Sequence, residues 1–179
     1  MQLIVSEVDS PVGRLRLVTC GRKLCALEFV EGARAVSSGH AARALAEKST
    51  LPATAPKRAT DPAARDVARR LGEYFAGDLR ALDAIEVDPS GTAFQRKVWS
   101  ALRIVRPGQT LSYADLARAI GAPKAVRAVG MANARNPIAI VVPCHRVIGA
   151  DGSLTGYGGG LERKRWLLQH EGALALLDV

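Results

Sequence analysis

The sequence predicts an α/β protein of the α+β type, in which a small antiparallel sheet with one helix precedes a mostly helical region. Two observations support this fold class. Short β-rich segments separated by turn residues occupy the first thirty positions, whereas apolar residues recur at helical spacing after residue 61. With 179 residues, 48% of them hydrophobic, the chain can form one domain or two small domains that share a core.

The first thirty residues are predicted to form a β-meander. Leu3–Val8, Leu15–Cys20 and Leu24–Val30 are rich in strand-forming residues, and turn residues separate them at Ser10–Gly13 and Gly21–Lys23. Because consecutive strands joined by short turns pair antiparallel, we expect a small sheet here.

Residues 31–60 have a different composition, in which Ala, Ser, Thr and Pro dominate and apolar periodicity is weak. This composition predicts a flexible surface insertion. Asp61 and Pro62 then provide the N-cap and first residue of a helix that ends at Gly77. Ile85–Val87 is a candidate for one more strand.

The second half predicts a series of helices. Apolar stripes and capping residues place helices after Thr92 and after Ser112, and over Lys124–Ala134 and Glu162–His170. Between the last two helices, Ile138–Val142 is a fully apolar, strand-like segment that leads to a cysteine.

Charge is distributed unevenly between the halves. Residues 1–90 carry a balance of +1 and residues 91–179 a balance of +7. We expect an N-terminal domain over 1–88 and a C-terminal domain over 91–175. The basic half favours a polyanionic partner such as nucleic acid, although charge alone fits a solvated basic surface equally well.

Tyr113–Ile120, the turn Gly121–Pro123 and Lys124–Ala134 have the outline of a helix-turn-helix, of plain or winged type. Lys124 and Arg127 open the second helix, where cations suit phosphate contacts, and its alanines would let the backbone approach a groove. The alternative is a structural helical hairpin with exposed charges, and spacing alone does not decide between them.

Composition also excludes several classes of protein. No apolar run is long enough to span a membrane, and the N-terminus lacks the features of a signal peptide, so we expect a cytoplasmic protein. Three cysteines are too few for a disulfide framework. Cys20, Cys25 and His40 lack regular zinc-ligand spacing, and we therefore expect no metal and no cofactor.

The stretch Pro143-Cys144-His145-Arg146 is the most informative in the chain. A thiol is a nucleophile only as the thiolate, and an adjacent histidine can take its proton directly or through water. Glu171 is a candidate to orient that histidine. Cys20 and Cys25, in predicted strands, fit the role of small buried hydrophobes.

These residues resemble a known family. Residues 142–149, Val-Pro-Cys-His-Arg-Val-Ile-Gly, are similar to the acceptor motif of the O6-alkylguanine-DNA alkyltransferases. The order and spacing of motifs agree over roughly residues 91–172, and the N-terminal meander fits the family's ribonuclease-H-like domain. The other matching segments are Phe94–Trp99, Ser112–Tyr113, Ala125–Gly130, Asn136–Pro137 and Gly156–Gly160.

The resemblance implies DNA repair by direct reversal of damage, as a methylated-DNA–protein-cysteine S-methyltransferase. An alkyl group would move irreversibly from guanine O6 onto Cys144, once per chain. His145 would act as base through a water, oriented by Glu171. Asn136 would brace the cysteine turn, and Tyr113 would assist protonation of the departing guanine. Acceptance of O4-alkylthymine is left open.

The resemblance also implies that the partner is double-stranded DNA containing O6-alkylguanine. The second helix would enter the minor groove and the damaged base would rotate out of the duplex. Arg127 would fill the gap, and Tyr113 would push on the neighbouring phosphate. The other residues expected at the DNA are Lys124, Ala125, Ala128 and Gly130. We expect a monomer in solution and leave cooperative assembly on DNA open.

In the implied substrate pocket, Tyr157 would wall the base, and main chain at Cys144, Val147 and Gly158 would hydrogen-bond the guanine edge. Gly156 and Gly159 would let main chain approach closely. Some relatives carry a hydroxyl residue where Gly158 stands, so the O6 contact would rely on main chain. Single use follows because a thioether offers water no polarised carbonyl to attack.

Two other functions are kept open. A non-enzymatic lesion binder would need Arg127 and Tyr113 but no thiol, and the intact Cys144, His145 and Glu171 speak against it. A cysteine hydrolase would need an oxyanion hole and turnover, and it would not explain the helix-turn-helix. Replacing Cys144 separates these functions, because chemistry would vanish in the transferase and the hydrolase while DNA binding would survive in the transferase and the binder.

Overall fold

The computed structural model describes residues 3–30, 57–58 and 61–174. Most of the predicted insertion at 31–60 therefore lies outside the described residues, as does His40. The described chain forms two compact units. The first unit is Met1–Ser90 with Pro137–Val141, and the second is Gly91–Asn136 with Val142–Val179. The expected domains did not include the return of residues 137–141 to the first unit.

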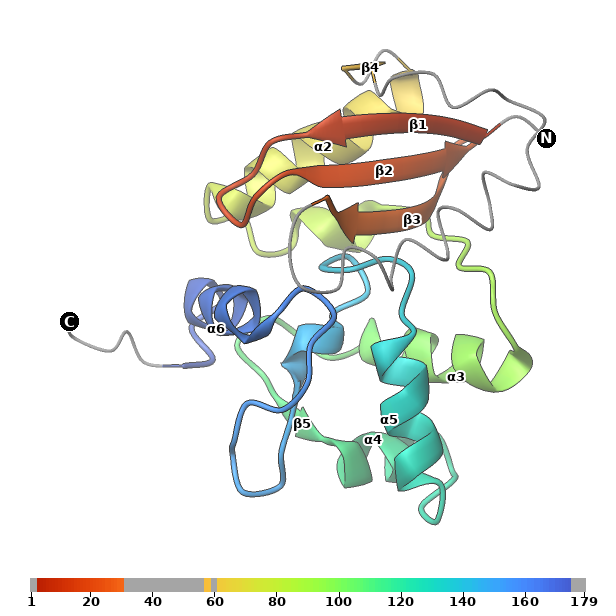
Figure 1. Cartoon of the computed structure of the whole chain (residues 1–179), viewed down its shortest axis with the longest axis vertical. Helices are drawn as coiled ribbons and strands as arrows, with labels where there is room; N and C mark the ends of the chain where they lie inside the picture. Colours follow the sequence, from red (N-terminus) through yellow and green to blue (C-terminus); the bar gives the residue numbers. More distant parts are fainter. Residues whose placement is uncertain (1–2, 31–56, 59–60, 175–179) are drawn as a thin grey trace. The chain divides into compact units, whose positions relative to one another are not determined.

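The first unit contains a four-stranded sheet in the order β3-β2-β1-β4 (Figure 1). Its strands are β1 (Leu3–Val8), β2 (Leu15–Cys20), β3 (Lys23–Phe29) and β4 (Lys57–Arg58). The first three strands pair antiparallel in sequence order, which confirms the predicted meander, and β4 runs parallel to β1.

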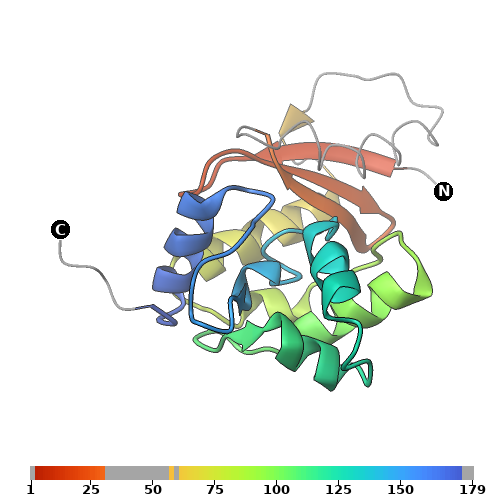
Figure 2. The same ribbon diagram turned by 60° about the horizontal axis from the view of Figure 1, so that its bottom comes forward.

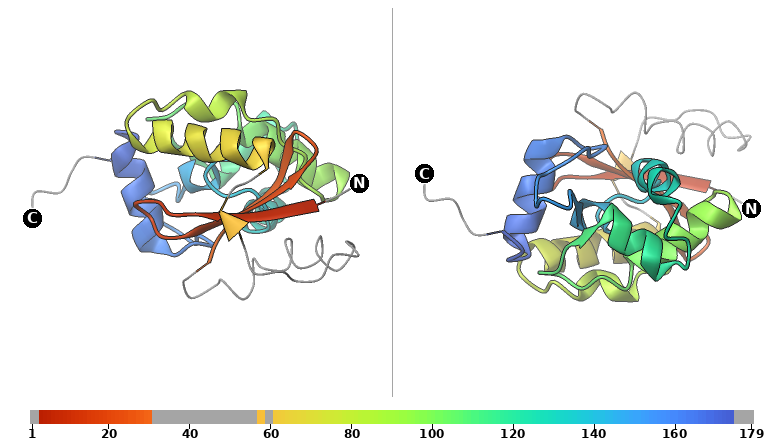
Figure 3. Two further views of the ribbon diagram at one scale, coloured as in Figure 1. Left: turned by 90° about the horizontal axis from the view of Figure 1, so that it is seen from above. Right: turned by 90° about the horizontal axis from the view of Figure 1, so that it is seen from below.

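Helix α2 (Pro62–Phe75) packs on one face of this sheet (Figure 3). It begins as predicted, because the Asp61 carboxylate accepts a hydrogen bond from the Ala64 backbone N–H at 3.1 Å and Pro62 occupies the first turn. The buried face of the helix consists of Ala64, Val67, Leu71 and Tyr74.

The expected strand at Ile85–Val87 is wrong. A short 3-10 helix, η1 (Ala81–Ala84), precedes it, and the segment makes a single parallel bridge between Val87 and Leu24. The Leu24 backbone donates to Glu86 O and accepts from Asp88 N, each at 2.9 Å. Pro89 has no N–H to extend the ladder, so pairing stops after one bridge.

The expected strand-like segment at Ile138–Val142 is also mostly wrong. The Leu27 backbone N–H donates to Pro137 O, and the Leu27 carbonyl accepts from Ala139 N, each at 2.9 Å. These two bonds form one bridge, between Leu27 and Ile138. Turns follow, and Ile140 has φ of 67°, in the left-handed region that β-branched residues rarely adopt. The run is apolar because it is buried, and its backbone is irregular.

The second unit is mostly helical (Figure 2). Its elements are α3 (Ala93–Leu102), β5 (Leu111–Ser112), α4 (Tyr113–Ala119), α5 (Val126–Ala134), the 3-10 helix η2 (Cys144–Arg146), β6 (Val147–Ile148) and α6 (Leu161–His170). Thr92 and Ser112 cap α3 and α4 as predicted, each in a reciprocal capping box.

Helix α5 begins at Val126, so the expectation that Lys124 opens it is wrong. Lys124 lies in the turn before the helix, and Ala125 is the N-cap without a side-chain hydrogen bond. The helix is held from its inner side, where the Trp99 indole N–H of α3 donates to Ala132 O at 2.9 Å. None of the helices in the described residues is long and apolar enough to cross a membrane.

Candidate active site and DNA-binding helices

Cys144 begins the turn η2 and is buried, with 7% of its surface exposed. The strand β6 follows at once and pairs in parallel with β5, so that Leu111 lies opposite Val147 and Ser112 opposite Ile148. Because β5 leads directly into α4, this small sheet ties the cysteine turn to the start of the helix-turn-helix.

Two asparagines from α5 and its end hold the cysteine turn. Asn136 Nδ2 donates to Val142 O at 2.8 Å and lies 3.1 Å from Cys144 Sγ. Asn133 Nδ2 donates to Cys144 O at 3.4 Å. Asn136 was expected to brace this turn, and the structure places it there. Asn133 was not expected, and its side chain is buried.

The protonation state of Cys144 depends on opposing effects. Burial raises the pKa of the thiol, and it outweighs the Asn136 hydrogen bond and the Lys164 charge, which both lower it. The resting side chain is therefore a thiol, and it needs a proton acceptor before it can act as a nucleophile.

A buried group of three charged or titratable side chains contains the two residues that follow Cys144, together with Glu171 from the end of α6. His145 Nε2 lies 3.0 Å from Glu171 Oε1, and Arg146 binds the same carboxylate through Nε and Nη2, each at 2.8 Å. Arg146 also donates to Val105 O. Glu171 was predicted to orient His145, and the fold brings the two together. Arg146 was not predicted to share the carboxylate.

Burial and pairing set the charges in this group. Burial lowers the pKa of His145, against the opposing effect of Glu171, so the imidazole is neutral at pH 7. Burial raises the pKa of Glu171, but the hydrogen bonds from His145 and Arg146 and the charge of Arg146 hold that pKa far below its usual range. The carboxylate is thus ionised. Nδ1 of His145 has no hydrogen-bond partner within the described part of the chain.

Lys164 on α6 is a functional candidate that the sequence reasoning missed. Its side chain is fully buried, and Nζ donates to Val147 O and to Thr155 O, each at 2.6 Å. Burial lowers the pKa of Lys164 to about 8, and the negative charge of a Cys144 thiolate opposes that shift. The ammonium thereby joins the strand after the cysteine to the loop before Tyr157.

The helix-turn-helix exposes some of the residues that were expected at DNA and leaves the others half-buried. Helices α4 and α5 pack together, and Arg127, Ala128 and Lys124 are exposed while Ala125 and Gly130 are half-buried. The Tyr113 ring lies against α5 at Gly130, where an added Cβ would be 3.7 Å from the ring, an ordinary van der Waals contact. Thr155 Oγ1 donates to the Tyr113 hydroxyl at 3.4 Å.

In the expected substrate loop, Tyr157 is buried and its ring lies edge-on to His145, with 6.4 Å between the ring centroids. Val147 is buried at the start of β6. Apart from the two chain neighbours of each glycine, no atom of the described residues lies within 4 Å of a Cβ built on Gly156 or Gly158, so packing among these residues does not require glycine there. Gly159 O accepts a hydrogen bond from Arg163 at 3.0 Å.

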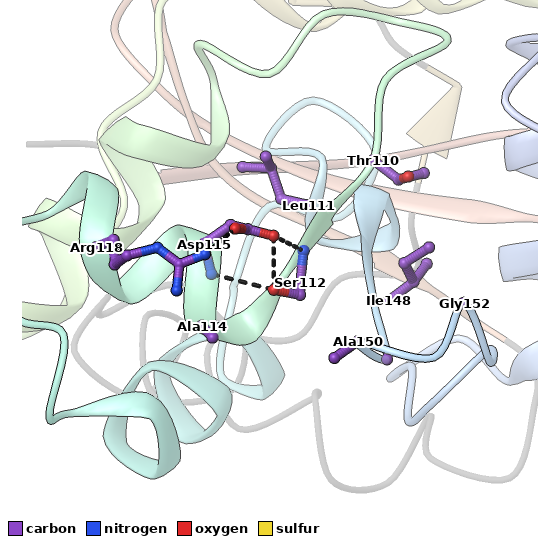
Figure 4. A pocket seen from close by; sticks show the side chains of 10 residues that line it. Thr110, Leu111, Ser112, Ala114, Asp115, Arg118, Ile148, Ala150 and Gly152 are labelled. Carbon is purple, nitrogen blue, oxygen red and sulfur yellow. Dashed lines mark hydrogen bonds and ion pairs between the residues drawn. The ribbon is translucent and has the colours of Figure 1, made fainter.

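A depression of about 440 Å³ lies beside the start of α4 (Figure 4). Its lining residues are Thr110, Leu111, Ser112, Ala114, Asp115, Arg118, Ile148, Gly149, Ala150 and Gly152. The carboxylate of Asp115 in this depression already accepts hydrogen bonds from Ser112, in the helix cap, and from Arg118. Cys144, His145 and Glu171 do not line it, so this depression is separate from the cysteine centre.

The second unit therefore combines a helix-turn-helix with a buried cysteine centre. Comparisons with known proteins show which protein family has this combination. The model of the 6-O-methylguanine DNA methyltransferase DNA-binding domain matches residues 93–173. The model of that family's ribonuclease-like domain matches residues 3–89. Together the two matches cover both units.

Individual relatives agree. A methylated-DNA–protein-cysteine methyltransferase of Mycobacterium bovis is 46% identical over 173 residues, which cover 96% of this chain and 94% of the relative. The Salmonella typhimurium protein of the same name is 58% identical over 107 residues, 60% of this chain and 63% of that protein. The solved structure of Mycobacterium tuberculosis OGT in complex with DNA is 41% identical, with a TM-score of 0.74 over 94% of this chain and 92% of that chain.

The chain belongs to the 6-O-methylguanine DNA methyltransferase family.

Proposed function

We propose that this protein repairs DNA by transferring the alkyl group of O6-alkylguanine to its own Cys144, once per chain. The observation that carries the proposal is the contact of Asn136 with the Cys144 sulfur, next to the buried His145–Glu171 pair. The relatives named methylated-DNA–protein-cysteine methyltransferases support the same reaction.

The chemistry begins with the Cys144 thiol, which gives its proton to the neutral His145, with Nδ1 as acceptor through an intervening water. Glu171 holds the opposite nitrogen and stabilises the imidazolium that forms. The thiolate attacks the alkyl carbon in line, an S–C bond forms and the C–O6 bond breaks. The electron pair stays on the guanine, which takes a proton with the assistance of Tyr113.

The DNA partner follows from the helix-turn-helix and from the solved DNA complex of the Mycobacterium tuberculosis relative. A monomer places α5 in the minor groove, where readout is degenerate and little sequence preference results. The damaged base leaves the stack, and the exposed Arg127 fills the gap. Four other residues of this region lie at or near the DNA backbone that lines the minor groove: Lys124, Ala125, Ala128 and Gly130.

The extruded base is held between Tyr157 and the main chain of the cysteine turn. Main-chain groups offer hydrogen bonds to the edge of the guanine. They belong to Gly156, Gly158 and Gly159, whose backbone is half-buried or exposed, and to Val147 at the start of β6. The product is a thioether that water cannot hydrolyse, so the acceptor is not regenerated.

The number of methyl groups transferred per chain tests this function. The protein is mixed with excess duplex that carries labelled O6-methylguanine, and its intact mass is followed to completion. We expect one methyl per chain and then no further reaction. Repeated turnover would point to a hydrolase, and tight lesion binding without a mass change would point to a binder that transfers nothing.

Lys164→Met tests how the buried ammonium supports the thiolate. Below pH 8 the wild-type lysine is charged and favours the thiolate, so the variant should react about tenfold more slowly with free O6-benzylguanine at pH 7. Above pH 8 the wild-type lysine also loses its charge, and the difference between the two rates should narrow. A ratio of rates that is constant from pH 6.5 to 9.5 would contradict this role.

The matched control is Lys97→Met, because Lys97 is an exposed lysine on α3 in the same unit. This control should keep the wild-type rate at every pH. Circular dichroism of both variants separates a loss of fold, which the missing bonds to Val147 O and Thr155 O could cause, from the change in the pH profile.

A further inference from the structure

Met131 is a large apolar side chain that the fold leaves 55% exposed, in the middle of α5. The opposite side of the helix is the buried side, where Val129, Ala132 and Asn133 pack inward. Met131 follows Arg127 by four residues, and residues four apart lie on the same face of a helix. It therefore stands one turn after the residue proposed to fill the gap in the duplex.

The surroundings of Met131 are basic. We name five exposed residues the exposed stripe: Lys124, Arg127, Ala128, Met131 and Arg135. Arg127 and Ala128 are adjacent, and the other steps along the stripe are three or four residues. Helix α5 contains no acidic residue. A hydrophobic protein partner would need a broader apolar face than one methionine between cations. A DNA groove fits the stripe, because it offers phosphates at its rims and sugars and base edges within.

We propose that Met131 packs against the deoxyribose and base edges of the minor groove, about one helical turn or 5.4 Å from Arg127, and sets how deeply α5 enters. The proposal rests on the proposed function. An unbranched thioether adapts to varied surfaces, and methionine is among the apolar residues that proteins insert into minor grooves. The contact adds affinity for duplex DNA without reading its sequence.

Met131→Ala tests the contact. We expect the variant to bind undamaged duplex and duplex with O6-methylguanine about tenfold more weakly, as loss of a buried methionine side chain implies. Its rate with the free base O6-benzylguanine, which needs no DNA, should fall far less. The slope of log Kd against log salt should stay at the wild-type value, because no phosphate contact is removed.

Two further variants make the result specific. Ile104→Ala removes an apolar side chain that is 79% exposed in the turn after α3, and this variant should bind DNA like the wild type. Arg135→Gln should reduce the salt slope, because it removes a cation of the exposed stripe. Unchanged affinity in Met131→Ala would overturn the proposal, and so would an equal loss of affinity and free-base rate, which would indicate a structural role.

Affinity for undamaged duplex is measured without chemistry, so it is independent of the transfer reaction. A wild-type chain that binds duplex but leaves Cys144 unmodified would refute the proposed function, and the role of Met131 would still be decided by the Kd values.

Discussion

Replacing Cys144 with alanine is expected to abolish alkyl transfer while the protein still folds and binds duplex DNA. The sulfur is the only atom of this side chain that can accept the alkyl group. Its removal leaves Asn136 satisfied, because the same Nδ2 also donates to Val142 O. Loss of a nucleophile removes a factor of about 10⁶ in enzymes where it has been measured, so transfer should be undetectable.

The matched controls are Cys20→Ala and Cys25→Ala, which remove the other two cysteines of the chain. Both thiols are buried in strands of the first unit, and burial raises the pKa of Cys25 to about 11. Each control should transfer one methyl per chain as the wild type does. Residual transfer in Cys144→Ala, or its loss in either control, would contradict the assignment of the acceptor.

Glu171→Gln is expected to have the second largest effect, on both stability and rate. The variant keeps the size of the side chain but removes the charge that pairs with Arg146 and orients His145. Breaking one partner of a buried ion pair costs about 3–5 kcal/mol of the free energy of unfolding. Loss of the positioned base should slow transfer to free O6-benzylguanine about a hundredfold.

Urea denaturation and single-turnover kinetics measure these two losses, and Glu162→Gln, an exposed change on α6, is the control that should show neither. The stabilisation by Glu171 is complete above its ordinary pKa of 4.5 and is lost as the pH falls, because its pKa in the fold is lower still. The difference in stability between wild type and variant should therefore shrink below pH 4.5. A wild-type rate in Glu171→Gln would refute the role of the pair.

Local sequence patterns predicted most of the secondary structure because the signals were themselves local. Asp61, Thr92 and Ser112 cap helices through side chains that bond backbone three residues away, and no distant partner is needed. Segments whose form depends on distant chain were predicted wrongly. Ile85 and most of Ile138–Val142 are buried apolar residues, but each segment makes only one bridge, to Leu24 or Leu27 of β3.

The residues of the candidate site also fall into those that a contiguous motif predicts and those that are distant in sequence. The motif around Cys144 and His145 is contiguous in sequence and resembles a known family, so both residues could be proposed directly. Glu171 lies 26 residues from His145. It was a candidate only because it lies in the same C-terminal region, and the resemblance then implied the same pairing.

Lys164 was missed because it sits in the charged run Glu162–Arg165, which has the composition of a solvated helix face. Helical spacing offered a signal, since Lys164, Leu167, Leu168 and Glu171 follow one another along a single stripe. All four are buried. A lysine in register with apolar residues and with the glutamate proposed to orient His145 therefore indicates a buried cation in this helix.

The position of the transferred methyl group in the protein decides whether Cys144 is the acceptor. After reaction with duplex carrying labelled O6-methylguanine, the protein is digested and its peptides are sequenced by tandem mass spectrometry. We expect the label as S-methylcysteine at Cys144 in essentially every chain, with Cys20 and Cys25 unmodified. Label on another residue, or release of the label as a small molecule with Cys144 unchanged, would contradict irreversible transfer to this cysteine.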